Sequence, residues 1–270
     1  MSAASPQLLE RVAEIARRAA GEILEVYAGA ELAARAKSDA SPLTAADLRS
    51  HRLIVDALQQ LAPEVPVLSE ESLHAPFAER ARWQRYWLVD PLDGTREFLS
   101  RNGEFTVNIA LVEGHAPVLG VVHIPVTDTS YRGLPAVGAW RQRHGGAAEP
   151  IRVARRSGSP LRVAGSRSHR GDTLDEFLAR AGPHRLLPLG SSLKFCLVAE
   201  GGADVYPRLS PTSEWDTAAA QAVVTAAGGT VCRLDGAPLE YNTREELVNP
   251  SFVAYGPADR DWLALLERIG

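Results

Sequence analysis

The sequence predicts a layered α/β protein built from two different halves. In the first half, apolar residues alternate with polar or small ones along 105–111 and, after a turn, the chain returns along 118–124, which is typical of an antiparallel hairpin. In the second half, short apolar strands alternate with helices, as in layered α/β folds. The 270 residues suffice for one large domain or two subdomains. We expect an N-terminal α+β subdomain with an antiparallel sheet at 1–155 and a C-terminal α/β subdomain at 156–270.

Two helices and several short strands account for the first half. The first helix begins at Ser5-Pro6, and its apolar residues recur at helical spacing as far as Tyr27. A second helix begins near Thr44, whose spacing to Asp47 is that of a capping box. Strands are expected at 65–68, 87–89, 105–111, 118–124, 130–132 and 139–142.

The second half follows a connecting segment, 141–159, that is rich in Gly, Arg and Ser. Its pattern alternates strand and helix, so helices should cover the faces of a second sheet. Strands are expected at 161–164, 185–189, 203–206, 230–232 and 252–254. Helices are expected at 173–181, 191–200, 215–227 and 262–269.

The segment WLVDPLDGTREF carries the clearest chemical signal. The apolar run 87–89 predicts a buried strand that ends on Asp90, because Pro91 has no N–H for a ladder. Asp93 and the glycine after it form a strong turn pair, so two carboxylates lie on a tight turn at a strand end. Such oxygens suit hard cations such as Mg²⁺. An isolated Asp-Gly pair, however, is more often only a turn.

Two further acidic signals favour a metal site. Glu70 and Glu71 directly follow the apolar run 65–68, and Asp216 stands at the start of the helix expected at 215–227. Alone, Asp216 is better explained as an N-terminal acid favoured by the helix dipole. Since three element ends each carry acids, we expect them to converge on one site. We place Glu71 outside direct contact with the metal.

These motifs together resemble a known family. DPLDGT, the upstream acidic pair and the later WD-x-A-A helix resemble the magnesium-dependent, lithium-sensitive phosphomonoesterases related to inositol monophosphatase. REF after DGT, and SSLKFCLVAEGGADVYPRL, are similar to the CysQ-type 3'(2'),5'-bisphosphate nucleotidases of that family. The resemblance extends from about Lys37 to Asn249. It implies an αβαβα sandwich of the inositol monophosphatase and fructose-bisphosphatase type, with the site where the two halves meet.

The resemblance also implies roles for the acidic residues. Four packed carboxylates would repel one another unless cations, about two or three Mg²⁺ ions, lay between them. Thr95 would position the attacking water, and Asp47 would hold Thr95. On spacing alone, Asp47 is only a helix cap. Glu70 is the third expected catalytic residue. The expected ligands are Glu70, Asp90, Asp93, Asp216 and the Leu92 carbonyl. Lys37 and Ser38 would lie in a flap over the metals.

The substrate-binding residues are expected mostly in the second half. GSSLK at 190–194 resembles an anion cradle, although Ser191 fits an ordinary N-cap equally well. His169 suits a base contact or a solvent-exposed loop, and Arg208 suits a phosphate. In the nucleotidases resembled, residues at the places of His169, Ser191, Lys194 and Arg208 hold the base, the sugar and the second phosphate. Asp93, Gly94, Thr95 and Asp216 complete the expected set.

The function implied is a Mg²⁺-dependent phosphatase that converts adenosine 3',5'-bisphosphate to AMP and phosphate, in sulfur assimilation. Phosphoadenosine phosphosulfate is a second candidate substrate. An inositol monophosphatase is the alternative, but there an asparagine usually precedes the phenylalanine, where this chain has Arg96-Glu97-Phe98. A non-catalytic cation or nucleotide sensor on the same fold is a third possibility, and it would not need Thr95 together with Asp47.

Composition narrows the partners. The net charge of -4 argues against a nucleic-acid partner, so the expected partner is a small nucleotide. No apolar run reaches the ~18 residues of a membrane span. Cys196 and Cys232 lie in apolar segments, which suggests buried thiols in a reducing compartment and hence a cytoplasmic protein. Peripheral contact with the inner face of the membrane is left open. The scattered histidines argue against zinc.

Overall fold

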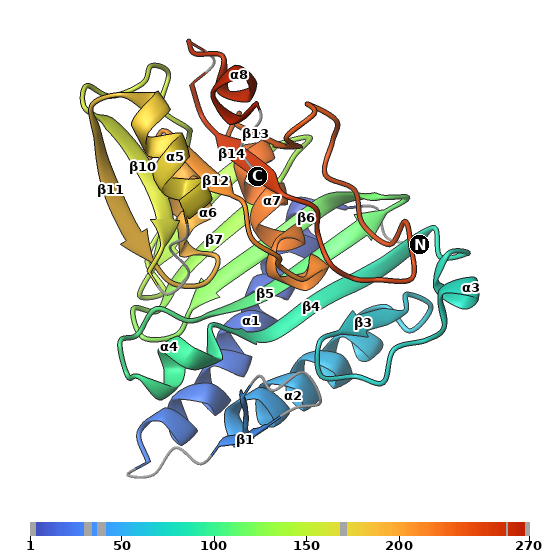
Figure 1. Ribbon diagram of the computed structural model, residues 1–270. Coiled ribbons are helices and arrows are strands. Elements are labelled where there is room, and N and C mark those ends of the chain that lie inside the picture. Colours follow the sequence, from blue (N-terminus) through green and yellow to red (C-terminus); the bar gives the residue numbers. More distant parts are fainter. Residues whose placement is uncertain (1–3, 30–33, 37–41, 168–171, 258, 268–270) are drawn as a thin grey trace.

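The chain folds into five layers. The computed structural model describes residues 4–29, 34–36, 42–167, 172–257 and 259–267. Figure 1 shows the layers, in which helices alternate with a first and a second sheet. The first sheet has seven strands and the second has five. This αβαβα arrangement confirms the layered α/β class expected from the sequence.

The first layer consists of α1 (Pro6–Tyr27) and α2 (Ala45–Leu61). Ser5 caps α1 by accepting a hydrogen bond from the Leu8 N–H, and the predicted capping box of Thr44 and Asp47 begins α2. The apolar faces of both helices pack under the seven-stranded sheet, where Ile23, Ile54 and Trp87 belong to one buried cluster.

The seven-stranded sheet has its strands in sequence order. Only the first pair is parallel, and a crossover with the short helix α3 (Phe77–Arg80) connects it. A two-stranded ribbon of β1 (Ala34–Ala36) and β2 (Pro42–Thr44) precedes α2. The segment 141–159, which was expected to be a connection, contains an edge strand at Glu149–Ile151 that was not predicted. The strands are β3 (Val67–Ser69), β4 (Arg85–Asp93), β5 (Thr106–Glu113), β6 (Ala116–Ile124), β7 (Thr129–Leu134), β8 (Gly138–Arg143) and β9 (Glu149–Ile151).

Strand β4 does not end at Asp90, so that prediction is wrong. The strand continues to Asp93, with a register shift in which Asp90 pairs with Asn108 and Asp93 with Thr106. Three steps along β4 match two along β5, which is a β-bulge. Pro91 lies in this bulge, where no ladder hydrogen bond is required of its nitrogen.

The middle layer consists of α6 (Leu193–Ala199) and α7 (Ala218–Ala226), with the 3₁₀ turn η1 (Glu214–Asp216) before α7. Helix α7 lies directly on the sheet. A Cβ on Gly120 would lie 2.1 Å from the Ala219 carbonyl oxygen, and one on Gly133 would lie 2.5 Å from the Val223 Cα. The helix that was expected at 215–227 begins at Ala218, and Asp216 lies in η1 instead.

The five-stranded sheet is mixed. Its order is β11-β10-β12-β14-β13, with β10 parallel to both neighbours and β14 antiparallel to both of its own. Helices α5 (Asp172–Ala181) and α8 (Trp262–Leu266) pack on its outer face. The strands are β10 (Leu161–Ser166), β11 (His184–Leu189), β12 (Val205–Arg208), β13 (Thr230–Arg233) and β14 (Phe252–Tyr255).

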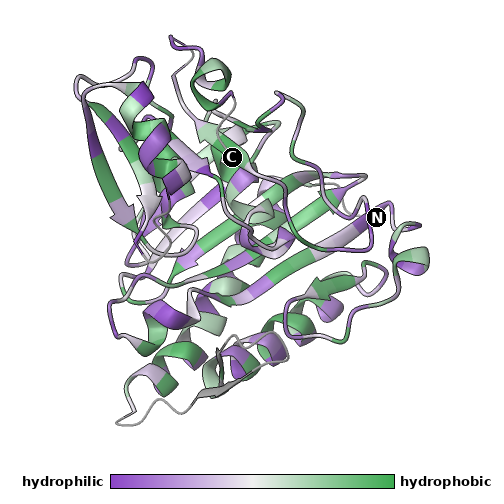
Figure 2. Cartoon of the chain, in the orientation of Figure 1, coloured by the Kyte–Doolittle hydropathy of each residue, from purple (hydrophilic) through white to green (hydrophobic). Residues whose placement is uncertain are grey.

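The two halves share a core. Figure 2 shows apolar residues along the strands of both sheets. Leu88 and Val122 of the first half belong to the same buried cluster as Val198 and Val223 of the second. The two sheets lie on either side of residue 155, but the division into subdomains at that point stays a prediction. Within the described part of the chain, no helix is long and apolar enough to cross a membrane.

Candidate metal and phosphate site

The β4 bulge positions two carboxylates. Asp90 is 1% exposed, and its Oδ1 accepts a hydrogen bond from the Leu92 N–H at 3.0 Å. Asp93 ends the strand, and Gly94, with a φ of 93°, starts the short helix α4 (Thr95–Leu99). The bulge and the left-handed glycine therefore place Asp90, Asp93 and Thr95 close together along the chain.

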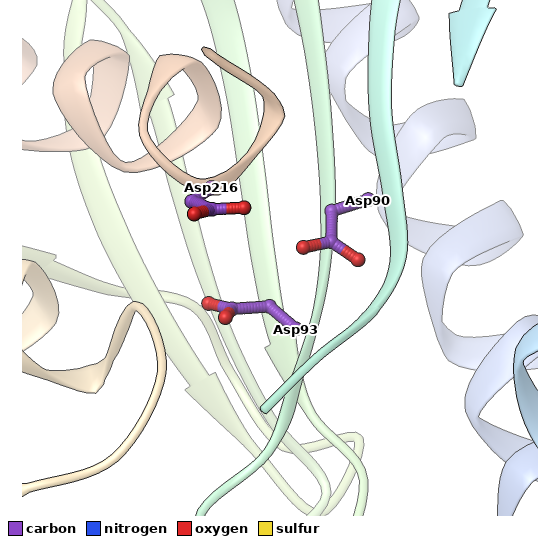
Figure 3. Close-up of side chains that lie close together, drawn as sticks. All are labelled: Asp90, Asp93 and Asp216. Atoms are coloured by element: carbon purple, nitrogen blue, oxygen red, sulfur yellow. The ribbon is translucent and has the colours of Figure 1, made fainter. Parts of the chain in front are cut away.

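The third carboxylate comes from the second half. Asp216 ends η1, and its Oδ2 accepts a hydrogen bond from the Ser213 N–H at 2.9 Å. Asp90, Asp93 and Asp216 each offer one oxygen, and these oxygens all lie within 4.8 Å of one another. Figure 3 shows the three side chains converging from β4 and the turn before α7. The structure thus brings together three of the four carboxylates expected as metal ligands.

The three carboxylates have raised pKa values. Burial raises the pKa of Asp90 well above its usual range, and the charges of Glu70, Asp93 and Asp216 raise it further. Burial followed by the charges of Asp93 and Glu70 also raises the pKa of Asp216. Burial raises the pKa of Asp93, although the Lys194 charge opposes this. One buried and two half-buried acids at this spacing form an oxygen-rich, anionic donor set that fits a hard cation.

Glu70 lies at the edge of this cluster. It follows β3, and its N–H donates to the Val89 carbonyl at 3.1 Å. Its side chain hydrogen-bonds Asp90 and adds to the charge around it, but Glu70 is not in the group of three. The ligand roles expected of Glu70 and the Leu92 carbonyl stay predictions.

Asp47 contacts Thr95 and caps α2 at the same time. Its Oδ2 accepts from the Thr44 N–H at 2.8 Å and from the Thr44 hydroxyl at 2.5 Å. Its Oδ1 accepts from the Thr95 hydroxyl at 3.4 Å. The cap and the Thr95 contact, which the sequence left as competing interpretations, are therefore both present.

Three side chains that were not predicted as site residues hold Asp93. Ser192 donates to its Oδ2 at 2.8 Å, and Asn108 and Thr106 reach the same oxygen at 3.3 and 3.4 Å. Asn108 and Thr106 lie on β5, next to β4, and both are fully buried. The regular alternation of β5 gave no means to distinguish these polar residues from others on the strand.

A cavity of about 280 Å³ opens beside the carboxylates. Seven of the eight residues expected to bind substrate line it, and the eighth, His169, lies outside the described residues, as do Lys37 and Ser38 of the expected flap. The lining residues expected from the sequence are Asp93, Gly94, Thr95, Ser191, Lys194, Arg208 and Asp216. Those not expected include Arg96, Glu97, Ser166, Ser192 and Tyr206.

Lys194 is buried beside the acids. It is 5% exposed, and its Nζ donates to the carbonyls of Ser191 at 2.5 Å and Leu189 at 3.3 Å. Burial lowers its pKa to about 8, against the opposing effect of Asp93. The lysine therefore carries its charge at neutral pH and offsets part of the negative charge of the site.

Ser191 and Arg208 differ from their expected surroundings. Ser191 is not an N-cap: Ser192 holds that position, and Ser191 has a φ of 40°. The Ser191 hydroxyl is buried and has no hydrogen-bond partner among the described residues. Arg208 ends β12, and its guanidinium donates to the carbonyls of Ser210 at 3.0 Å and Pro211 at 2.8 Å. Arg208 thus supports the loop leading to η1 as well as lining the cavity.

A family model and similar proteins were compared with this chain. A family model described as the inositol monophosphatase family matches residues 6–265. The 3'(2'),5'-bisphosphate nucleotidase CysQ of Salmonella typhimurium is 50% identical over 246 residues, which cover 91% of this chain and 98% of that protein. CysQ of Escherichia coli K12 is 49% identical over the same length and shares.

Solved structures align with nearly the whole chain. The crystal structure of CysQ from Bacteroides thetaiotaomicron, a bacterial member of the inositol monophosphatase family, aligns with a TM-score of 0.83 at 37% identity and covers 96% of this chain and 100% of that one. An inositol monophosphatase from Anabaena aligns with a TM-score of 0.77 at 25% identity, covering 98% and 96%.

Proposed function

Because the chain belongs to the inositol monophosphatase family, as its motifs had indicated, we propose that it is a 3'(2'),5'-bisphosphate nucleotidase that requires Mg²⁺. It removes the 3'-phosphate of adenosine 3',5'-bisphosphate to give AMP and phosphate, with phosphoadenosine phosphosulfate as a second substrate. The observation that carries the proposal is the convergence of three carboxylate oxygens within 4.8 Å beside a cavity lined by Lys194 and Arg208. A role in sulfur assimilation and a cytoplasmic location stay predictions.

The donor set supports Mg²⁺ as the cofactor. Asp90, Asp93 and Asp216, with Glu70 and the Leu92 carbonyl, would hold about two or three ions. Bound Mg²⁺ supplies positive charge for the phosphate oxygens and lowers the pKa of water. All the proposed side-chain ligands are carboxylates, as expected for a hard cation.

Thr95 and Asp47 orient the attacking water in this proposal. The Thr95 hydroxyl has one proton, which it donates to Asp47 Oδ1. Its lone pairs are then the groups that a water beside it can reach, so Thr95 accepts a hydrogen bond from that water. Asp47, held by the α2 cap, keeps the hydroxyl in this orientation.

The remainder of the substrate sets specificity. The carboxylate site contacts only the phosphate that is cleaved, so discrimination must come from groups that touch the rest of the nucleotide. Lys194 and Arg208 place two cations at the cavity, where they suit a dianionic 5'-phosphate. Ser191 lines the same cavity, and we propose that its unpartnered hydroxyl contacts the sugar.

Phosphate release tests this proposal. The enzyme would be assayed on adenosine 3',5'-bisphosphate, phosphoadenosine phosphosulfate, inositol 1-phosphate and fructose 1,6-bisphosphate, in Mg²⁺ and in EDTA. We expect Mg²⁺-dependent release that is fastest on the bisphosphate nucleotide and inhibited by lithium. Asp93→Asn should lower turnover at least about a hundred-fold. Faster release from inositol 1-phosphate would favour an inositol monophosphatase, and no release from any substrate would favour a binding protein.

A further inference from the structure

Ser192 contacts both segments that bring carboxylates to the site. Its hydroxyl lies 2.8 Å from Asp93 Oδ2 and 2.7 Å from the main-chain carbonyl of Asp216. Asp93 ends a strand of the first sheet, whereas Asp216 ends the turn before α7. Ser192 itself is 2% exposed and holds the N-cap position of α6. One small side chain therefore lies between two elements whose relative position determines the distance between carboxylates.

Asn108 limits the directions in which the Ser192 hydroxyl can donate. The Asn108 Nδ2 donates to Ser192 Oγ at 3.0 Å and lies 3.3 Å from Asp93 Oδ2. Since Ser192 Oγ accepts from Asn108, its single proton is directed to Asp93 Oδ2 or to the Asp216 carbonyl. The Thr106 hydroxyl has one proton, which it donates either to Asn108 Oδ1 at 3.1 Å, where it supports the amide, or to Asp93 Oδ2 at 3.4 Å. All of the donors to Asp93 described here meet Oδ2, so they fix the rotation of its carboxylate.

We propose that Ser192 and Asn108 are positioning residues that hold Asp93 and the Asp216 segment at a spacing that favours Mg²⁺ over Ca²⁺. The inference rests on the proposed function, because it assumes that the carboxylates hold a metal. Mg²⁺ requires near-octahedral oxygen ligands at about 2.0–2.1 Å, whereas Ca²⁺ accepts flexible geometry at about 2.3–2.6 Å. Loss of the contacts that fix the spacing should therefore weaken Mg²⁺ binding more than Ca²⁺ binding.

Metal binding without substrate tests the inference. Isothermal titration calorimetry with MgCl₂ and, separately, CaCl₂ would compare the wild type with Ser192→Ala, Asn108→Ala and the double variant. Ser192→Ala should weaken Mg²⁺ binding about 10- to 100-fold, as is typical when the groups that hold metal ligands are removed. Ca²⁺ binding should change about threefold or less. Since the two residues share a hydrogen bond, the double variant should lose less than the product of the single losses.

Two further variants separate positioning from folding. Ser192→Thr keeps the hydroxyl and should recover most of the Mg²⁺ affinity. Ser130→Ala is the matched control, because Ser130, like Ser192, is a buried serine, but it bonds His123 at 2.8 Å and not Asp93 or the Asp216 segment. Its melting temperature should fall without a change in Mg²⁺ affinity. If Ser192→Ala does not fold, Asn108→Ser replaces it, with the same expected shift.

The outcomes distinguish the inference from the proposed function. A folded Ser192→Ala variant with the wild-type ratio of Mg²⁺ to Ca²⁺ affinity would overturn the positioning role while leaving the metal site intact. Equal losses for both ions would also overturn it, because spacing would then not be what the contacts control. A wild-type protein that binds neither ion would instead contradict the metal site itself.

Discussion

The Thr95 hydroxyl donates to one oxygen of Asp47 while the other oxygen of that carboxylate accepts from the Thr44 N–H at the start of α2. One side chain thus connects the cap of an outer helix to the turn that carries Asp93. The position of Thr95 therefore depends on the cap of the outer helix α2.

Asp47→Asn should separate these two tasks. An amide has one acceptor oxygen, so it cannot serve both the cap and the Thr95 hydroxyl. We expect turnover to fall about 10²-fold, because Asp47 orients Thr95 and a small misplacement of a positioning group costs about that much. The melting temperature should fall by about 2–4 °C, which corresponds to roughly 1 kcal/mol of lost capping. Steady-state kinetics and thermal unfolding would measure both effects.

Thr44→Ala provides the control for Asp47. It removes the Thr44 hydroxyl from the cap but leaves Asp47 and Thr95 in contact. The melting temperature should fall by a similar amount while turnover stays near that of the wild type. Equal turnover losses in the two variants would mean that Asp47 acts only through the helix.

Arg208→Ala tests recognition of the second phosphate. A charge-assisted hydrogen bond contributes about 1.5–3 kcal/mol, or roughly ten- to a hundred-fold in kcat/KM. We expect a loss of that size on adenosine 3',5'-bisphosphate and a much smaller one on 3'-AMP, which has no 5'-phosphate. Arg233→Ala is the matched control, since Arg233 ends a strand of the same sheet and pairs with Asp235 at the surface. Equal losses on both nucleotides would show that Arg208 acts through the loop of Ser210 and Pro211.

Asp90 should make the metal-free protein less stable as the pH rises. Its pKa is raised in the folded state, so the folded protein binds this proton more tightly than the unfolded chain does. That stabilisation is complete below the ordinary carboxyl pKa and is lost as the pH rises through the raised value. In EDTA at pH 8, Asp90→Asn should therefore melt about 2–4 °C above the wild type, or about 1 kcal/mol. The difference should shrink as the pH falls.

Excess Mg²⁺ should reverse this order. The wild type gains stability from bound metal by mass action, and the variant has lost one ligand. Thermal unfolding of both proteins at pH 6 and pH 8, in EDTA and in Mg²⁺, measures the effect. A wild-type melting temperature that does not respond to Mg²⁺ would contradict the assignment of Asp90 to a metal.

His123 should cause a separate loss of stability in acid. It is 1% exposed, its Nδ1 lies 2.8 Å from the Ser130 hydroxyl, and burial lowers its pKa to about 4 even though the Asp128 charge acts in the opposite direction. The unfolded chain takes up a proton near pH 6.5, and the folded protein does so only near the lowered value. Stability present above pH 6.5 is therefore lost as the pH falls toward 4, with about 2 kcal/mol lost by pH 5.

Urea unfolding at pH 7.5 and pH 5 would measure this loss. His123→Asn keeps a polar group near Ser130 but does not titrate, so its free energy of unfolding should fall less between the two pH values. A variant with the same pH dependence as the wild type would show that other groups control acid stability.

Much of the fold was predictable because its signals are local. The cap at Thr44 and the hairpin of β5 and β6 each follow from a few neighbouring residues, and the structure confirms them. The bulge at Pro91 was not predictable, because it depends on how Asp93 pairs with Thr106 on the next strand. Proline alone indicates only that a ladder bond is missing.

The site was predictable only where its residues stand in motifs. Asp90, Asp93 and Asp216 lie in recognisable segments, and the structure places them together. Asn108 and Ser192 are 84 residues apart and become neighbours only when α6 packs on the first sheet, so no local pattern identifies them. Asp216 was identified by its motif, but its 3₁₀ turn resembles the start of a helix in the sequence, so its local structure was not predicted.

The packing of α7 on the first sheet has a consequence during protein synthesis. Every strand of that sheet has been made once Ile151 leaves the ribosome, but the helix that covers its inner face begins only at Ala218. Until then, apolar residues such as Val122 and Tyr131 lack the partners they have in the finished core. The nascent chain therefore passes through a stage with a sheet face open to aggregation or chaperone binding. A chain truncated before η1 should expose this face permanently, and it should also lack Asp216.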